Sequence, residues 1–121
     1  MSFPSYPPTS PPTIAPQATV EELKKRLDWG EPGLTIIDTR NLESYNHDRI
    51  RGAISMPFNE NLVDRAKASL EPIRDIYVYG DSDRETAESA DRLRQAGLKN
   101  VAEISGGLSA WQASGFPVEA G

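Results

Sequence analysis

The chain has 121 residues, of which 26% are charged and 37% apolar, with a formal net charge of −5 and a pI near 4.8. This length and composition predict one soluble globular domain with a single core. The negative charge argues against nucleic acid or an anionic membrane as the partner, because both would repel the average surface. The sequence contains no cysteine, which excludes a disulfide, a thiolate zinc site and a thiol nucleophile from this chain. We predict neither a metal nor a cofactor.

Residues 1–17 differ in composition from the rest of the chain. They hold six of the ten prolines and no charged side chain, so we predict a disordered tail followed by a domain at residues 18–121. The Pro-x-x-Pro spacing within residues 6–12 is typical of a polyproline docking segment, and an unspecific flexible extension is the alternative. Ile14 is the candidate for a short first strand. Because no apolar run approaches the roughly 20 residues of a spanning helix and no secretion signal is visible, we expect a cytoplasmic protein without an integral membrane segment.

Helices and strands alternate along the first half of the domain. A capping box formed by Thr19 and Glu22 opens a predicted helix over residues 19–29 that has one apolar face. A buried strand is expected at residues 34–37. Weaker signals then predict a helix at 41–45, a turn with a short strand at 50–57, and a helix at 62–70 that Pro72 terminates.

The stretch from residue 75 to residue 90 organises the rest of the domain. Residues 76–79 are β-branched or aromatic, as in a strand buried on both faces of a parallel sheet. There follow a polar loop at 80–86, a helix at 86–96, a strand at 101–104, a glycine pair and a helix at 108–114. This order predicts an α/β fold with helices on both faces of a parallel sheet. Ligands of such sheets bind at loops leaving the carboxyl ends of strands, so we expect the functional site at residues 80–86.

Four motifs occur in a fixed order along the domain. They are Ile-Ile-Asp-Thr-Arg at 36–40 with Glu43 and Tyr45 after it; Arg-Ile-Arg-Gly-Ala-Ile-Ser-Met-Pro at 49–57; Leu-Arg-Gln-Ala-Gly at 93–97; and Gly-Gly-Leu-Ser-Ala-Trp at 106–111 with Gly-Phe-Pro-Val at 115–118. Together they make residues 18–119 resemble the rhodanese family. Arg49 stands where that family usually has histidine, and Arg51 where it usually has proline.

The resemblance implies a three-layer α/β/α domain with a five-stranded parallel sheet and an active loop that begins with cysteine directly after the central strand. In the family this thiolate takes up sulfur as a persulfide, and loop N–H groups hold the charge. Counting from the motifs on both sides places the cysteine position at Gly80. Glycine has no side chain to carry sulfur, so covalent sulfur transfer by the usual route is not available to this chain.

The remainder of the loop is strongly acidic. It consists of Asp81, Ser82, Asp83, Arg84, Glu85 and Thr86. Its three carboxylates are expected to oppose a bound anion, and a compatible alternative is that they cap the helix at 86–96. The loop also resembles a calcium loop and an aspartyl-phosphatase motif. The first lacks its glycine and its final glutamate, and the second lacks its threonine or valine, so we discard both.

Several candidates lie outside the loop. Asp38 and Arg40 suit a catalytic acid and an anion clamp, but such a pair at a strand end more often fixes neighbouring loops through a salt bridge. His47 is the only histidine, and we expect it to face solvent because no nucleophile lies near it in sequence. Trp111 and Phe116 are expected in the core.

We therefore predict a catalytically inactive rhodanese-like module that binds or regulates another protein, whose identity the sequence does not give. Its recognition surface is expected to comprise the loop at 80–86 and the flanking Asp38, Arg40, Arg49 and Arg51. Two alternatives remain open. One is a sulfurtransferase that uses a thiol supplied by a partner, and the other is a small-ligand sensor with an emptied pocket.

Overall fold

The computed structural model describes residues 14–30 and 33–121, and the predicted tail lies outside these ranges for residues 1–13. A five-stranded parallel sheet with the order β1-β6-β5-β2-β4 confirms the predicted α/β fold. In its centre, Ile37 pairs with Val78, and Ile76 pairs with Val101. The strands of this sheet are β1 (Gln17–Ala18), β2 (Leu34–Asp38), β4 (Ile54–Ser55), β5 (Asp75–Tyr79) and β6 (Asn100–Ile104).

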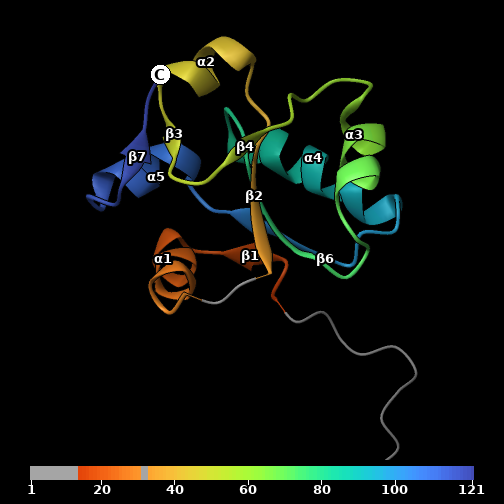
Figure 1. Ribbon diagram of the computed structural model, residues 1–121, viewed down its shortest axis with the longest axis horizontal. Helices are drawn as coiled ribbons and strands as arrows, with labels where there is room; N and C mark the ends of the chain where they lie inside the picture. Colours follow the sequence, from red (N-terminus) through yellow and green to blue (C-terminus); the bar gives the residue numbers. More distant parts are fainter. Residues whose placement is uncertain (1–13, 31–32) are drawn as a thin grey trace, which may run out of the picture.

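Helices cover both faces of the sheet (Figure 1). One face carries α1 (Val20–Asp28) and α5 (Gly107–Ala113), and the other carries α3 (Leu62–Ser69) and α4 (Asp83–Gln95). The short helix α2 (Leu42–His47) follows the carboxyl end of β2. None of the helices in the described ranges combines the length and apolar character that crossing a bilayer requires.

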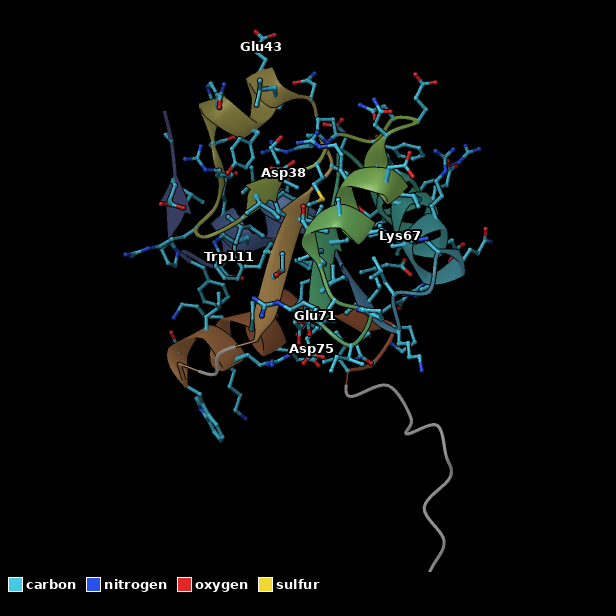
Figure 2. The ribbon with its side chains drawn as sticks, turned by 45° about the vertical axis from the view of Figure 1, so that its right-hand side comes forward. Asp38, Glu43, Lys67, Glu71, Asp75 and Trp111 are labelled. Carbon is cyan, nitrogen blue, oxygen red and sulfur yellow. The ribbon has the colours of Figure 1, made fainter. Side chains whose placement is uncertain are left out.

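The central strand β5 is buried on both faces, as its composition predicts. Ile76 and Val78 pack into the cluster under α3 and α4, while Tyr77 and Tyr79 pack into the cluster under α1 and α5. This alternation follows from the two-residue period of a strand. Trp111 is fully buried in the second of these clusters, which confirms its predicted place in the core (Figure 2).

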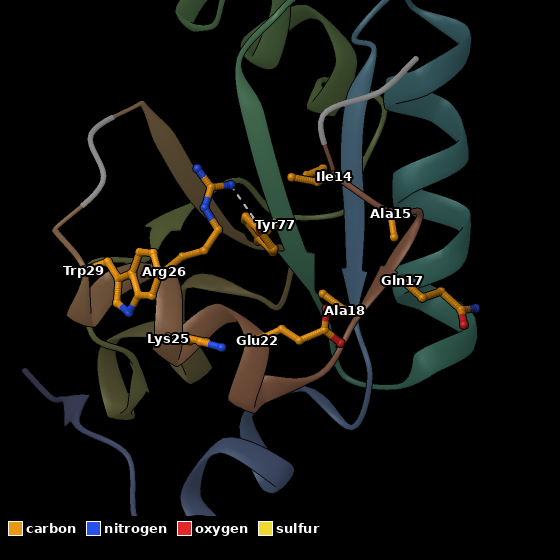
Figure 3. Close-up of a pocket in the computed structure, with 9 residues that line it drawn as sticks. All are labelled: Ile14, Ala15, Gln17, Ala18, Glu22, Lys25, Arg26, Trp29 and Tyr77. Carbon is orange, nitrogen blue, oxygen red and sulfur yellow. Dashed lines mark hydrogen bonds between the residues drawn. The ribbon is translucent and has the colours of Figure 1, made fainter.

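Helix α1 begins and docks as its sequence predicts. The capping box is present, since the Glu22 N–H donates to Thr19 Oγ1 at 3.1 Å and the Thr19 N–H donates to Glu22 Oε1 at 3.2 Å. Further along the helix, Arg26 Nη1 donates to the Tyr77 hydroxyl at 3.0 Å and to Asp75 Oδ2 at 2.9 Å (Figure 3). These contacts join α1 to the amino end of β5.

Two short pairings differ from the sequence-based expectations. The first strand lies at Gln17–Ala18 and not at Ile14, because the Glu103 N–H donates to Pro16 O at 2.8 Å and fixes the register there. An antiparallel pair of β3 (Arg49–Ile50) and β7 (Val118–Glu119) was not predicted. Strands of two residues show no hydrophobic alternation, so the sequence carries no signal for them.

Candidate functional site

A pocket lies at the carboxyl end of β5, where the sequence predicts the site. Its volume is about 340 Å³. It opens between the residue after β5, the start of α4 and the start of α5. The residues that line it are Arg40, Gly80, Asp81, Ser82, Asp83, Gly106, Gly107, Leu108 and Ser109. The structure therefore brings the first four residues of the predicted loop together with Arg40.

The loop itself is shorter than predicted. Helix α4 begins at Asp83, three residues before the predicted start, with Ser82 as its N-cap. The Ser82 hydroxyl accepts from the Glu85 N–H at 3.1 Å, and the Ser82 carbonyl accepts from the Thr86 N–H at 2.9 Å. Serine is as good an N-cap as aspartate, and here it satisfies the first turn. The prediction that the carboxylates cap a helix at 86–96 is wrong for this reason, and Asp83 and Glu85 lie in the first helical turn.

Gly80 has no room for a side chain in the present arrangement. A Cβ atom built on it would lie 2.6 Å from Thr39 Oγ1 and 3.4 Å from Thr86 Oγ1. Thr39 is 1% exposed, and its hydroxyl donates to the Tyr79 carbonyl at 3.2 Å. Thr86 is also buried, and its hydroxyl donates to the Ser82 carbonyl at 2.9 Å. The hydrogen-bonded hydroxyl of Thr39 thus closes the space beside Gly80, and that of Thr86 lies at ordinary contact distance.

Asp81 and Asp83 line the pocket and Glu85 lies beside it, and the three acidic side chains have different environments. Asp83 Oδ1 accepts from the Gly106 N–H at 3.0 Å and so ties the start of α4 to the residue that precedes α5. Asp81 is exposed. The pKa of Glu85 is raised by its partial burial and then by the charges of Asp81 and Glu88. The carboxylates of this surface repel one another, and they would repel a bound anion in the same way.

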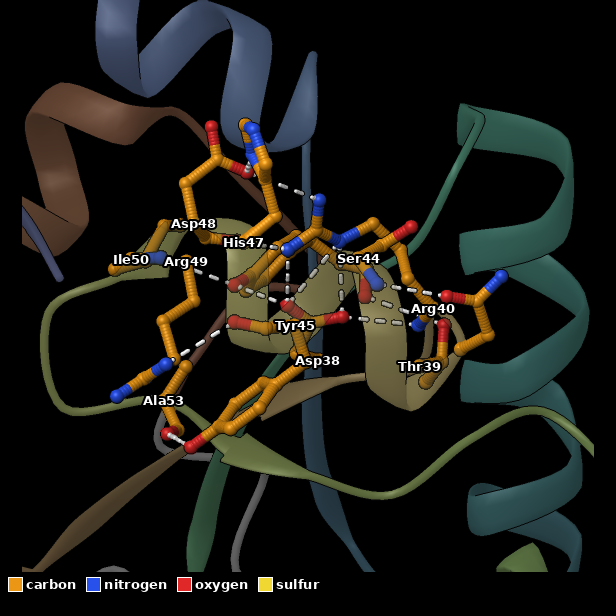
Figure 4. A network of polar contacts seen from close by, with 12 residues as sticks. Asp38, Thr39, Arg40, Ser44, Tyr45, His47, Asp48, Arg49, Ile50 and Ala53 are labelled. Carbon is orange, nitrogen blue, oxygen red and sulfur yellow. Dashed lines mark hydrogen bonds and ion pairs between the residues drawn. The ribbon is translucent and has the colours of Figure 1, made fainter. Parts of the chain in front are cut away.

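A buried polar network fixes the wall that carries Thr39 (Figure 4). Arg40 donates to Asp38 through Nη2 at 2.7 Å and through Nε at 3.1 Å, and Asp38 is fully buried. Asp38 Oδ2 also accepts from the Tyr79 hydroxyl at 2.6 Å, and that hydroxyl accepts from the Ile50 N–H at 3.1 Å. The geometry matches the interpretation of Asp38 and Arg40 as a pair that fixes neighbouring loops.

The network also shifts the pKa of two of its members. Burial lowers the pKa of Arg40, but the hydrogen bonds and charge of Asp38 outweigh burial and raise it. Burial raises the pKa of the Tyr79 hydroxyl, and its hydrogen bond to Asp38 and the charge of Asp38 raise it further. Arg40 also lies 3.7 Å from Asp48 Oδ1. Because two carboxylates already neutralise Arg40, it is a weak clamp for an anion in the adjoining pocket.

Arg49 and Arg51 do not line this pocket, although the sequence predicts them in one recognition surface with the loop at 80–86. Arg49 donates to the Tyr45 carbonyl at 3.1 Å and lies 4.4 Å from the centre of the Tyr45 ring. Arg51 lines a separate hollow beside Trp111 and Pro117. The cause is the pairing of β3 with β7, which directs this segment toward the C-terminal strand.

The remaining polar candidate is His47 at the end of α2. Its side chain is 83% exposed, as predicted, and its Nδ1 lies 3.4 Å from Asp48 Oδ1. Sequence reasoning missed three contributors to the site, namely Thr39, Tyr79 and Asp48. Thr39 and Tyr79 act through contacts between β2 and β5, which lie about forty residues apart in the chain. The one available signal is that Thr39 stands between the two polar residues at the strand end.

The chain matches a known family over most of its length. The family model described as the rhodanese-like domain matches residues 19–114. YrkF of Bacillus subtilis, whose name describes it as a candidate sulfur carrier protein, is 28% identical over 96 residues, which are 79% of this chain and 50% of that protein. The HTH-type transcriptional regulator Rv0324 of Mycobacterium tuberculosis is 35% identical over 104 residues, which are 85% of this chain and 44% of that protein. The chain thus spans about half the length of these curated relatives.

Solved structures include similar chains at higher identity. The crystal structure of the Alr3790 protein from Anabaena sp. is 50% identical with a TM-score of 0.82, and the match covers 85% of this chain and 91% of that one. The solution structure of the rhodanese-like domain from the same protein is 50% identical with a TM-score of 0.83, covering 88% of this chain and 80% of that one.

Proposed function

The chain belongs to the rhodanese-like domain family, and from this premise we propose that it is a non-catalytic member that binds or regulates a partner protein. The observation that carries the proposal is the environment of Gly80. This glycine stands at the position that the family resemblance assigns to the nucleophile, and Thr39 Oγ1 lies 2.6 Å from where its Cβ would be. Both the thiol and the space for it are therefore missing.

The chemistry of sulfur transfer supports this reading. A persulfide intermediate forms on a thiolate, and the sequence contains no cysteine. The hydroxyl nearest to the nucleophile position belongs to Thr39, and it is already donated to the Tyr79 carbonyl. A threonine hydroxyl needs an adjacent base to act as a nucleophile, and the only histidine, His47, faces solvent from α2.

The charge around the pocket supports binding of a basic group in place of an anion. At ~6 Å and an effective dielectric of ~20 to 40, each carboxylate would raise the energy of a bound monoanion by roughly 1 to 3 kcal/mol. The N-terminus of a helix attracts an exposed anion by only about 0.3 to 1 kcal/mol. Asp81 and Glu85 would instead attract a lysine or arginine side chain of a partner.

A regulatory role has support from one relative. The transcriptional regulator of Mycobacterium tuberculosis matches 85% of this chain over 44% of its own length, so a domain of this kind forms part of a protein named as a regulator. A second candidate function also has support. The name of the Bacillus subtilis relative points to sulfur carriage, which favours a domain that positions a sulfur atom on a thiol supplied by a partner.

A thiocyanate assay separates the two functions. We expect the chain to release no thiocyanate from thiosulfate and cyanide, beside an active rhodanese as the positive control. Turnover by the chain alone would refute the proposal. Turnover that appears when thiol-containing protein fractions of the host are added, and that requires the chain, would establish the sulfur-carrying alternative.

A charge-reversal pair tests the binding surface directly. Partners captured from the host by the wild-type chain should be lost with Asp81→Lys, which reverses an exposed charge at the pocket. They should be retained with Glu71→Lys, the same change at an exposed position near the start of β5, at the opposite edge of the sheet (Figure 2). Equal capture by both variants would place the recognition surface away from Gly80.

A further inference from the structure

A second hollow lies beside Tyr77 of β5, on the face of the sheet that α1 covers. Its volume is about 350 Å³, in the range of roughly 300 to 1,000 Å³ that is typical of ligand pockets. Helix α1 forms one wall, and the segment that leads into β1 forms the other (Figure 3). Tyr77 lies between the two walls, and Ile14 lies at the outer end of the second wall.

The lining of this groove is aromatic and aliphatic. Trp29 ends α1 with 72% of its surface exposed, an unusual position for so large an apolar ring. Ile14, Ala15 and Ala18 add aliphatic surface. The Tyr77 hydroxyl accepts from Arg26, which leaves its own proton to donate, and the indole N–H of Trp29 is a donor as well.

The cationic side chains at the groove are engaged in contacts of their own. Arg26 Nη1 lies 2.9 Å from Asp75 Oδ2, so this guanidinium is neutralised within the fold. Lys25 Nζ lies 5.9 Å from the centre of the Trp29 ring and extends that aromatic surface. Glu22, also in the lining, is bound in the capping box of α1. The groove therefore offers aromatic rings with hydrogen-bond donors and little net charge.

We propose that this groove binds an uncharged proline-rich segment, and that its occupant in the full chain is the chain's own N-terminal segment, residues 3–12. Proline-rich chains in the polyproline II conformation dock onto aromatic-lined grooves, because their ordering costs little entropy and their carbonyls have no internal donors. Residues 3–12 contain five prolines, two aromatic residues and no charged side chain. Their composition matches the groove in polarity and in hydrogen bonding.

The position of the segment selects it over other proline-rich chains. The described part of the chain begins at Ile14, which itself lines the groove, and 13 residues precede it. Residues 9–13 give a connection of five residues in which the chain can reverse, and residues 3–8 would span about 19 Å at ~3.1 Å per residue in a polyproline II helix. A tether this short gives an effective concentration on the order of millimolar, which makes even weak docking substantial.

Two indole signals provide the test in the full chain. Trp29 is exposed, whereas Trp111 is fully buried with its Nε1–H donated to Pro117 O at 2.7 Å, so Trp111 is an internal control. In two-dimensional nitrogen–proton correlation NMR spectra, a Trp29→Phe variant assigns the two indole N–H signals. The combined change Pro7→Ser and Pro8→Ser should shift the Trp29 signal by more than it shifts the Trp111 signal.

The matched control replaces Thr9 and Ser10 with alanine, which keeps every proline, and it should leave the Trp29 signal in place. The wild-type position of that signal should not change on dilution, because the occupant is tethered. An unchanged Trp29 signal in the proline variant would overturn the proposal. A wild-type signal that moves on dilution toward its position in the proline variant would overturn it as well, since the occupant would then be a second copy of the chain.

Discussion

The closed space beside Gly80 predicts that even a methyl group at this position will destabilise the fold. Gly80→Ala adds only the Cβ atom, which would lie 2.6 Å from Thr39 Oγ1. The backbone of Gly80 is not in the left-handed region, so the contact with Thr39 decides the outcome. Thr39 must turn its hydroxyl away and lose the bond to the Tyr79 carbonyl, and the crowding that remains must be relieved by a shift of the strand ends.

The expected cost follows from three contributions. Loss of the Thr39 hydrogen bond costs about 0.5 to 1.5 kcal/mol. Overpacking of a tight site costs about 1 to 3 kcal/mol. The lower flexibility of the unfolded chain with alanine offsets about 0.4 to 1 kcal/mol. We expect Gly80→Ala to lower the free energy of unfolding by about 1 to 3 kcal/mol.

A double-mutant cycle with Thr39→Ala isolates the contact. That change removes the hydroxyl but leaves the Tyr79 carbonyl with a donor, since the Thr39 N–H still donates to it at 2.9 Å. In the Thr39→Ala background, Gly80→Ala should be nearly neutral, which gives a coupling of about 1 to 3 kcal/mol in urea unfolding. Coupling near zero, or a stabilising Gly80→Ala in the wild-type background, would refute the steric argument.

Three further predictions follow from other parts of the structure. Trp111→Ala should lower the free energy of unfolding in urea by about 3 to 5 kcal/mol, because the ring is fully buried and lies 5.0 Å from the Phe116 ring. The change also removes the hydrogen bond to the Pro117 carbonyl. A loss below ~1 kcal/mol would contradict the place of this ring in the core. Deletion of residues 1–12 should lower the melting temperature by less than roughly 5 °C, about 1 kcal/mol, because the core lies within the described residues; a larger drop would mean that the segment belongs to the folded core. Glu85→Gln should stabilise the chain at neutral pH and lose this effect in acid, because a raised carboxyl pKa means that stability falls as pH rises through that pKa; a destabilised variant at neutral pH would contradict the sign.

The sequence predicts those parts of the fold that have a repeating pattern or a local partner. The two-faced strand β5 and the capping box of Thr19 and Glu22 are such cases, and both are confirmed. The predicted start of α4 is wrong because Ser82 and the acidic residues after it are all suitable N-caps. Only the structure shows which one accepts a hydrogen bond from the first turn. Two-residue strands such as β3 and β7 depend entirely on tertiary pairing.

The candidate site likewise has features that the sequence predicts and features that it does not. The position of Gly80 at the end of β5 and the Asp38–Arg40 pair could be predicted, since each rests on neighbours in sequence. The contact of Thr39 with the space beside Gly80 could not, because it depends on how closely β2 and β5 approach at their ends. That contact adds a closed space to the missing thiol as a second reason for the proposed lack of catalysis.

Under the proposed function, this contact sets the minimum change that would give the chain sulfurtransferase activity. Gly80→Cys alone supplies a thiol but meets the Thr39 hydroxyl, so it should give an unstable chain with little turnover. Adding Thr39→Ala opens the space. Adding Asp81→Ser and Glu85→Arg removes the repulsion of an anionic substrate. Asp83 is best kept, because its carboxylate accepts from the Gly106 N–H and holds the pocket together.

Thiosulfate turnover should therefore rise in steps along this series. We expect none with the wild-type chain, little with Gly80→Cys, more when Thr39→Ala is added, and most with all four changes. The gain from the two charge changes should shrink at high salt, where screening weakens the repulsion, while the gain from Thr39→Ala should persist, because it is steric. If Gly80→Cys alone already matched the turnover of the quadruple variant, neither the Thr39 hydroxyl nor the acidic surface would limit turnover. The missing thiol would then be the whole difference from an active sulfurtransferase.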